Sequence, residues 1–336
     1  MLIGKQTWEF ENTPTIISTG IVGGPFEGNG KLSNTFDQIY ADLWLEQNSF
    51  EQAHQLLLES ACNHAFKKIN RTPANVQFLI AGDLINQITP TNFTAKKLQI
   101  PYIGTFSACA TSMESLALAA NLINSKNANL ILTGASSHNA AVEKQFRYPT
   151  EYGGQKPPTA QWTVTGAGVG LLSDKGKGPK VTSATIGKVI DMGMTDPFNM
   201  GEAMAPAAVD TIATHLNDRG IEASYYDCII TGDLAKIGRL IAIDLAKEKN
   251  LFLNEDSFLD CGLMIYNNDQ EVFAGASGAG CSAVVTYGHL INQLNEKKLN
   301  KILIVATGAL LSPLTVQQKQ SIPCIAHAVS IENGGV

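Results

Sequence analysis

The sequence carries one cysteine whose position suits covalent chemistry. Cys109 lies in the small-residue run Ser107-Ala-Cys-Ala-Thr-Ser112, after a strand-like stretch at 102–106 and at the start of an apolar helical stretch. The first N–H groups of a helix are unpaired and carry partial positive charge, which lowers the pKa of a nearby thiol. Such a thiol can act as an acyl-accepting nucleophile. The alternative is a structural cysteine, which the segment alone favours because Cys is among the most buried residue types.

The elements that would position Cys109 occur twice along the chain. Phe78-Leu-Ile-Ala-Gly-Asp-Leu84 recurs 150 residues later as Cys228-Ile-Ile-Thr-Gly-Asp-Leu234. Asn129-Leu-Ile-Leu-Thr-Gly-Ala135 is likewise echoed by Ile302-Leu-Ile-Val-Ala-Thr-Gly-Ala309. This order of strand, tight turn, buried helix and strand predicts two copies of one α/β unit, with a site where equivalent loops converge.

Composition limits the classes of protein to consider. The 336 residues are 44% hydrophobic and 16% charged, which is typical of a packed globular protein. The net charge of −6 argues against a nucleic-acid partner. The first residues do not resemble a signal peptide, and no apolar run has the length of a membrane helix, so we expect neither. The six cysteines form no CxxC pair, so we expect no zinc site and no disulfide framework.

Periodicity predicts an alternation of strands and helices. β-Branched runs indicate strands at 76–81, 130–133, 226–231 and 301–306. Helical spacing of apolar residues indicates helices at 49–68, 206–217, 237–249 and 282–294, with Pro206 in a first turn. The Gly- and Lys-rich segment 173–180 separates an expected first half, 1–175, from a second, 176–336. A long loop at 136–163 is expected to cover a site.

The duplicated half, with a cysteine heading a buried helix, resembles the thiolase superfamily, which includes thiolases and β-ketoacyl synthases. Gln161-Trp-Thr-Val-Thr-Gly-Ala-Gly168 resembles the glycine-rich strand that closes the first half of these proteins. The resemblance covers nearly the whole chain. It implies an α/β fold with layers α-β-α-β-α and mixed five-stranded sheets, and it places Cys109 at the acyl-accepting position. It also implies a homodimer, with the strand at 129–135 as the contact edge.

The rest of the family's catalytic set is missing. Ketosynthase III enzymes carry a His in the turn where this chain has Gly232, and an Asn where it reads Gly275-Ala-Ser-Gly278. Condensation needs donors aimed at a developing oxyanion or enolate, so these changes predict a non-catalytic protein. The open alternative is a Cys109-dependent acyltransferase or ketosynthase-like enzyme that uses another base, such as His138 or His327. Cys281 lies outside the sequence context of the second cysteine of a thiolase.

A longer signature points to one non-catalytic branch. Thr195-Asp-Pro-Phe-Asn-Met-Gly-Glu-Ala-Met-Ala-Pro-Ala-Ala208 resembles the stage V sporulation protein AD family, as do Ser136-Ser-His138 and Glu143-Lys-Gln-Phe-Arg-Tyr-Pro149. The resemblance implies a protein that binds dipicolinic acid, alone or as its calcium chelate, for uptake into the developing spore. It implies cytosolic synthesis, a peripheral place on the spore inner membrane and partners among membrane proteins of the same operon. We expect no cofactor and no resident metal.

Dipicolinate is a flat ring with two carboxylates, so its site needs N–H donors or cations and an apolar slot. Helix N-termini and Gly-rich turns supply such donors and let the backbone approach a ligand. Asp233 is also expected to cap a turn, with a calcium role as the weaker alternative. A third hypothesis keeps the shell only as a dimeric platform for membrane partners. The candidate ligand-binding residues are Cys109, Ser137, His138, Arg147, Trp162, Gly232, Asp233, Lys236, Ser277 and Gly308.

Overall fold

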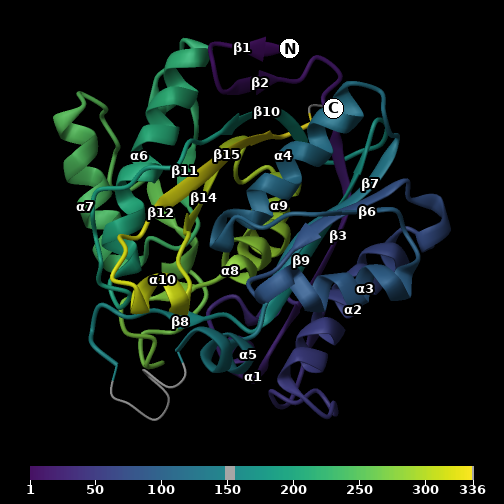
Figure 1. Ribbon diagram of the computed structural model, residues 1–336. Helices are drawn as coiled ribbons and strands as arrows, with labels where there is room; N and C mark the ends of the chain where they lie inside the picture. The colour runs from purple at the N-terminus through teal and green to yellow at the C-terminus, as the bar shows by residue number, and fades with distance from the viewer. Residues whose placement is uncertain (148–155, 335–336) are drawn as a thin grey trace.

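Two five-stranded mixed sheets form the frame of the molecule (Figure 1). The computed structural model describes residues 1–147 and 156–334, without the side chain of Arg147. In the first half the strand order is β3 (Thr15–Gly23), β9 (Gly166–Ser173), β7 (Leu130–Ser137), β5 (Phe78–Gly82) and β6 (Tyr102–Gly104). In the second half it is β10 (Lys180–Ile186), β15 (Cys324–Glu332), β14 (Lys301–Ala309), β11 (Cys228–Thr231) and β12 (Phe258–Asp260).

The two sheets repeat the same pairing pattern. Strand β5 is parallel to β6 and β7, and β9 is antiparallel to both β7 and β3. Strand β11 is parallel to β12 and β14, and β15 is antiparallel to both β14 and β10. The sheets meet edge to edge through one pairing, Lys180 with Thr15. The predicted duplication is therefore confirmed at the level of strand order and direction.

Helices complete a five-layer arrangement, as predicted. Helices α2 (Phe50–Lys68) and α3 (Thr89–Leu98) pack on the outer face of the first sheet. Helices α4 (Thr111–Asn124) and α8 (Ala279–Val284) lie between the sheets in the central core. Helices α6 (Met200–Arg219) and α7 (Ala235–Glu248) cover the outer face of the second sheet. Figure 1 shows α2 and α3 on one side, and α6 and α7 on the other.

Smaller elements extend this frame. The N-terminal strands β1 (Leu2–Ile3) and β2 (Thr7–Glu9) pair with each other, and β2 also pairs with β10. Strand β4 (Gln38–Ile39) pairs with β3, and β8 (Trp162–Thr163) pairs with β13 (Ala276–Ser277). The remaining helices are α1 (Pro25–Gly28), α5 (Asn139–Val142), α9 (Ile291–Asn295) and α10 (Pro313–Gln317).

Three expectations about elements were wrong in detail. Helix α6 begins at Met200, so Pro206 lies inside it rather than in its first turn. The buried small side chains that precede Pro206 explain this, because they pack against the outer face of the second sheet. The helix expected at 282–294 begins at Ala279 and contains a π-helical turn, Val285–Leu290. The segment expected as the loop 136–163 contains the end of β7, helix α5, a π-helical turn at Glu143–Arg147 and strand β8.

The strand expected at the dimer edge lies inside the sheet. Strand β7, which contains most of the range 129–135, is hydrogen-bonded to β5 on one side and β9 on the other. A strand paired on both sides has no free backbone groups for a second chain. The outer strand of the first half is β6, and Ile103 on it is 40% exposed.

The connection between the halves is short. Strand β9 ends at Ser173 and β10 begins at Lys180. The expected boundary between 1–175 and 176–336 falls within this connection.

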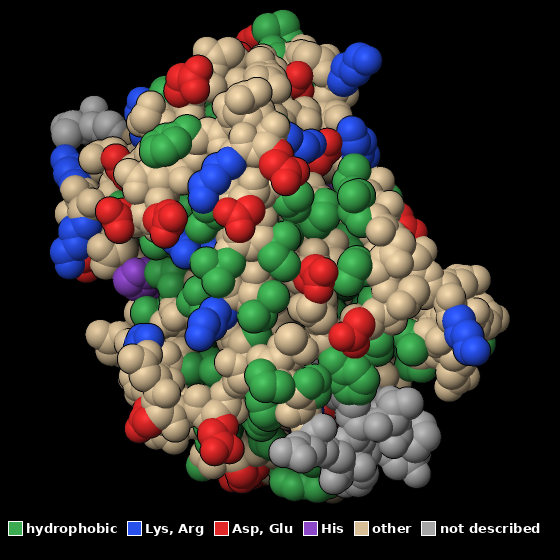
Figure 2. Space-filling view, turned by 90° about the vertical axis from the view of Figure 1, so that its left-hand side faces the viewer, with side chains coloured by type: hydrophobic (Ala, Val, Ile, Leu, Met, Phe, Trp, Pro, Cys, Tyr) green, Lys and Arg blue, Asp and Glu red, His purple; other side chains and the backbone are tan. Residues whose placement is uncertain are grey.

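The face around α7 shows hydrophobic side chains among interspersed cations and anions (Figure 2), and Leu240 on α7 is 51% exposed. Mixed signs on this face disfavour a broad grip on a polyanion.

Candidate functional site

A strained turn presents Cys109 to the second half of the molecule. The 3-10 turn Ala108–Ala110 leads into α4, and Ala108 has a φ of +50°, a value that non-glycine residues rarely adopt. Strand β14 packs directly against this turn, because a Cβ at Gly308 would lie 2.5 Å from the carbonyl oxygen of Ser107. Gly308 thus allows β14 to approach the Cys109 turn, and the ligand contact predicted for Gly308 stays a prediction. Backbone strain of this kind is concentrated at functional sites.

Asp233 is the centre of the cluster that faces Cys109. Its carboxylate accepts a hydrogen bond from the Thr307 hydroxyl at 2.7 Å, from the Ser277 hydroxyl at 3.2 Å and from the Gly278 N–H at 3.1 Å. Burial raises the pKa of Asp233, and these bonds together with one from the Cys109 thiol oppose the rise. Two other segments of the second half therefore converge on the buried carboxyl group of Asp233, opposite Cys109.

The surroundings of Cys109 do not favour a thiolate. Burial raises the pKa of the thiol well above its ordinary value, and the charge of Asp233 and the hydrogen bond to Asp233 raise it further. Hydrogen bonds from Ser277 and the Gly278 backbone only partly oppose this. The prediction of a lowered pKa at the helix start was wrong, because burial and then the Asp233 carboxyl group raise the pKa of the thiol more than the hydrogen bonds from Ser277 and Gly278 lower it.

The turn after β11 is held by a second buried carboxylate. Asp260 accepts hydrogen bonds from the Leu234 N–H at 2.9 Å, the Ala235 N–H at 3.0 Å and the Thr231 hydroxyl at 2.7 Å. Burial raises the pKa of Asp260 to about 7. Ala235 has a φ of +54°, so this turn is strained as well. Asp260 thus holds the turn that places Asp233.

Gly232 and Ser137 also lie in this cluster, each with a structural contact. A Cβ at Gly232 would lie 3.0 Å from the backbone of Ala306 and Thr307, so a side chain there would press on β14. The Ser137 hydroxyl donates to the Val164 carbonyl at 2.7 Å and accepts from the Gly280 N–H at 3.1 Å. These contacts join the end of β7 to the start of α8.

The remaining predicted ligand-binding residues lie outside the cluster or at its edge. The Nε2 atom of His138 bonds to the Leu43 carbonyl at 2.8 Å, and its ring lies 5.5 Å from that of Phe50, so it packs toward α2. Lys236 is exposed at the start of α7. The backbone of Trp162 pairs with Ala276, while its ring lies 5.0 Å from that of Phe26. The side chain of Arg147 lies outside the described residues.

Sequence reasoning missed three polar groups that the structure buries. Thr307 lies beside Gly308 near the end of β14, and its hydroxyl bonds to Asp233. Glu27 is fully buried, accepts from the Thr165 N–H at 3.0 Å and from the Tyr266 hydroxyl, and has its pKa raised to about 7 by burial. The only signal for Asp260 was an acidic residue that ends an apolar strand.

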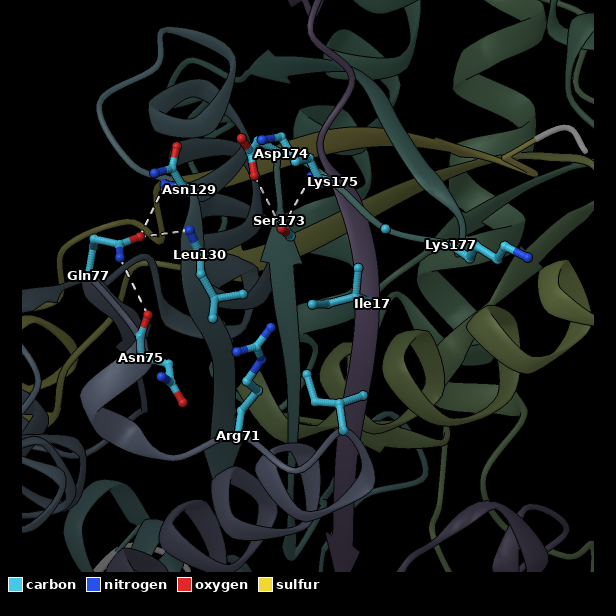
Figure 3. Close-up of a pocket in the computed structure, with 12 residues that line it drawn as sticks. Ile17, Arg71, Asn75, Gln77, Asn129, Leu130, Ser173, Asp174, Lys175 and Lys177 are labelled. Carbon is cyan, nitrogen blue, oxygen red and sulfur yellow. Dashed lines mark hydrogen bonds between the residues drawn. The ribbon is translucent and has the colours of Figure 1, made fainter.

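A separate groove of about 600 Å³ lies at the opposite end of the first sheet (Figure 3). It is lined by Leu130 at the start of β7 and by Ser173 at the end of β9, whereas the Cys109 cluster meets the other ends of these strands. Arg71, Lys175 and Lys177 line it. Its position separates this groove from the Asp233 cluster.

Comparisons with known proteins identify both the family and the fold. The sequence model of "Stage V sporulation protein AD" matches residues 4–332. The chain is 50% identical over 334 residues to Stage V sporulation protein AD of Bacillus subtilis (strain 168), and the match covers 99% of this chain and 98% of that protein. The chain belongs to the stage V sporulation protein AD family. The family resemblance found in the sequence is thereby confirmed.

Solved enzyme structures share the fold of this family member at low sequence identity. The 3-oxoacyl-[acyl-carrier-protein] synthase III of Aquifex aeolicus VF5 superposes with a TM-score of 0.57 at 13% identity, over 95% of this chain and 99% of that one. Human mitochondrial 3-ketoacyl-CoA thiolase superposes with a TM-score of 0.59 at 12% identity, over 96% and 99%. At such low identities the likeness establishes the thiolase-like fold alone. The chemistry of this protein has to be argued from the residues of its site.

Two further observations concern membranes and metals. Among the residues that the structure describes, no helix is both long and apolar enough to cross a membrane. Within the same residues, no group of three or more His, Cys, Asp or Glu side chains is arranged to hold a metal ion.

Proposed function

We propose that this family member binds dipicolinic acid at the cluster around Cys109 and Asp233, and that it serves uptake of this ligand into the developing spore without turning it over. The observation that carries the proposal is the pairing of the Cys109 thiol with the Asp233 carboxyl group. The position that supplies a histidine in ketosynthase III enzymes is Gly232, packed against β14.

The electrostatics of the cluster argue against condensation. A condensing enzyme stabilises a developing oxyanion or enolate with donors aimed at it. Here the thiol is hydrogen-bonded to a carboxyl group whose oxygens already accept hydrogen bonds from Thr307, Ser277 and Gly278. A developing negative charge would meet repulsion from Asp233, and the raised pKa keeps the thiol protonated at neutral pH.

The same carboxyl group bears on the form of the ligand. Free dipicolinate is a dianion at neutral pH, and an ionised Asp233 would repel it. Burial raises the pKa of Asp233, so either a proton on Asp233 or a cation that accompanies the ligand would relieve this repulsion. The calcium chelate carries no net charge, because one Ca²⁺ balances two carboxylates. We therefore propose the calcium chelate as the preferred ligand, with calcium entering as part of the ligand rather than as a resident metal.

Calorimetric titration with dipicolinic acid, with and without calcium, tests this function. We expect saturable binding that is tighter with calcium, weakened about tenfold or more by Cys109→Ala and absent for phthalate, which lacks the ring nitrogen. Lys177→Met, in the groove at the far end of the first sheet, is the matched control and should bind like the wild type. If no heat is seen under any condition, the scaffold hypothesis replaces this one.

A second candidate function is acyl transfer through Cys109. The strained φ of Ala108 and the partial exposure of Cys109 favour it. A thiol reagent at neutral pH separates the two functions. Ligand binding without turnover predicts slow labelling of Cys109, and Asp233→Asn should speed the labelling because it removes the charge that raises the thiol pKa. Rapid labelling of the wild-type thiol by an acyl thioester would favour the enzyme.

We further propose that the protein is a homodimer bound peripherally to the spore inner membrane, beside membrane proteins of the same operon. The outer position of β6 and the exposure of Ile103 on it support this strand, in place of β7, as the proposed contact edge. Light scattering during size exclusion should give twice the chain mass of 35.9 kDa. A monomer would contradict the dimer and leave the ligand proposal standing.

A further inference from the structure

A second cavity lies between the central helix α4 and the inner face of the second sheet. Its volume is about 300 Å³. Glu114 and Leu118 on α4 line one wall, and His327 on β15 with Ile186 on β10 lines the other. Trp8 and other residues of the N-terminal segment complete the lining. None of the residues that contact Asp233 lines this cavity, so it is separate from the Cys109 cluster.

His327 brings an unused donor to this cavity. The side chain is 3% exposed, and its Nδ1 atom accepts a hydrogen bond from the Gly187 N–H at 3.3 Å. Burial lowers the pKa of His327 to about 4, so the ring is neutral at pH 7. A neutral imidazole that accepts at Nδ1 carries its proton on Nε2. Within the described part of the chain, this buried Nε2 atom has no hydrogen-bond partner.

Glu114 brings an unused acceptor. Its Oε2 atom is buried and also lacks a hydrogen-bond partner among the described residues. Burial raises the pKa of this carboxyl group, and a hydrogen bond from Ser107 opposes the rise. Buried polar atoms in native proteins nearly always have partners, so an unpaired donor and an unpaired acceptor lining one cavity point to a missing occupant.

The chemistry of the two groups narrows the class of occupant. A metal ion needs a free lone pair on the imidazole, but the only one, on Nδ1, is taken by the Gly187 N–H. Lys5, which is exposed, also lines the cavity, but an anion held between His327 and Glu114 would face the Glu114 carboxyl group. A single water occupies only about 30 Å³, far less than the cavity, and would leave the apolar walls of Leu118 and Ile186 unfilled.

We propose that this cavity binds a small, uncharged, flat molecule with a carbonyl oxygen next to an N–H group, such as a primary amide or a lactam. The carbonyl oxygen accepts from Nε2 of His327, and the N–H donates to Oε2 of Glu114. The ring of the ligand packs against Trp8 and the apolar walls. The proposal is independent of dipicolinate binding, since the two sites share no lining residue.

Benzamide and 2-pyridone are suitable probes, with acetophenone as a control of similar shape that lacks the N–H. Titration by ligand-observed NMR should show saturable binding of both amides to the wild type. Because each variant removes one hydrogen-bond partner, Glu114→Leu and His327→Phe should each weaken binding about tenfold. Acetophenone should bind more weakly than benzamide and be unaffected by Glu114→Leu. Lys177→Met, in the groove at the far end of the first sheet, should bind the amides like the wild type.

Several results would overturn the proposal. These are no binding of either amide to the wild type at millimolar concentration, binding of the amides by both variants as tightly as by the wild type, or equal binding of benzamide and acetophenone to the wild type. If the variants fail to fold, as judged by circular dichroism, the wild-type preference for benzamide over acetophenone decides. A crystal soaked with benzamide should then show it between Glu114 and His327, and ordered water alone in that place would count against the proposal.

Discussion

The same Gly-Asp-Leu motif does different work in the two halves of the molecule. In the first half, Asp83 serves its own turn, because its carboxylate accepts from the Ile85 N–H at 2.7 Å, the Thr91 N–H at 2.9 Å and the Thr91 hydroxyl. In the second half, Asp233 reaches out to Thr307, Ser277, Gly278 and Cys109. One copy stabilises a turn, and the other assembles a site.

A replacement at a neighbouring strand explains how Asp233 became free for this role. In the first half, Ala81 pairs with Gly104 at the ends of β5 and β6. At the equivalent positions of the second half, Thr231 pairs with Asp260. Asp260 accepts from the turn N–H groups of Leu234 and Ala235. The turn is thus held by a different carboxyl group, and the repeated aspartate can face the first half.

The largest expected effect comes from removing each aspartate in turn. Asp233→Ala leaves the donors of Thr307, Ser277 and Gly278 unpaired and should reduce the free energy of unfolding by about 2–4 kcal/mol. Asp83→Ala should reduce the free energy of unfolding by a similar amount. Only Asp233→Ala should abolish binding of calcium dipicolinate, because Asp233 holds the Thr307, Ser277 and Gly278 groups of the site in place. Urea denaturation and calorimetric titration at one pH measure the two effects, and equal binding by both variants would break the comparison.

A double-mutant cycle tests the replacement at β11 and β12. Asp260→Gly with Thr231→Ala restores the residue types of the first half. Asp260→Gly alone should cost about 3 kcal/mol, since it leaves three buried donors without an acceptor. Because the two side chains share one hydrogen bond, the double variant should be more stable than the sum of the single effects by about 1 kcal/mol. Additive single effects would show that the pair does not act as a unit.

The smallest expected effect is a difference in pH dependence. Burial raises the pKa of Asp83 to about 6 and that of Asp260 to about 7, against an unfolded value of about 3.9. Each folded carboxyl group binds its proton more tightly, so its contribution to stability is fully present below the unfolded value and is lost as pH rises through the folded value. The destabilisation caused by Asp260→Asn should therefore shrink up to about pH 7.

The destabilisation caused by the matched variant Asp83→Asn should stop changing with pH above about pH 6. Between pH 6 and 7 the gap between wild type and Asp260→Asn should narrow by up to about 1.4 kcal/mol, while that for Asp83→Asn stays constant. Urea denaturation across this pH range measures both gaps. Parallel behaviour of the two variants would mean that the two turns hold their carboxyl groups in equivalent surroundings.

The sequence by itself determined the duplication, the order of strands and helices, the family and the meeting of several predicted residues. Cys109, Asp233, Ser277, Gly232 and Gly308 were all found at strand ends or tight turns. Local patterns carry this information, because strand ends and Gly-rich turns of equivalent units meet at the same edge of a sheet.

Only the tertiary structure decided what those residues face. The raised pKa of Cys109 depends on Asp233, which is distant in sequence, and the same is true of the contact between His138 and Leu43. The interior place of β7 depends on its pairing with both β5 and β9. Burial and charge at a side chain are sums over neighbours that folding brings together, and spacing along the chain does not encode those sums.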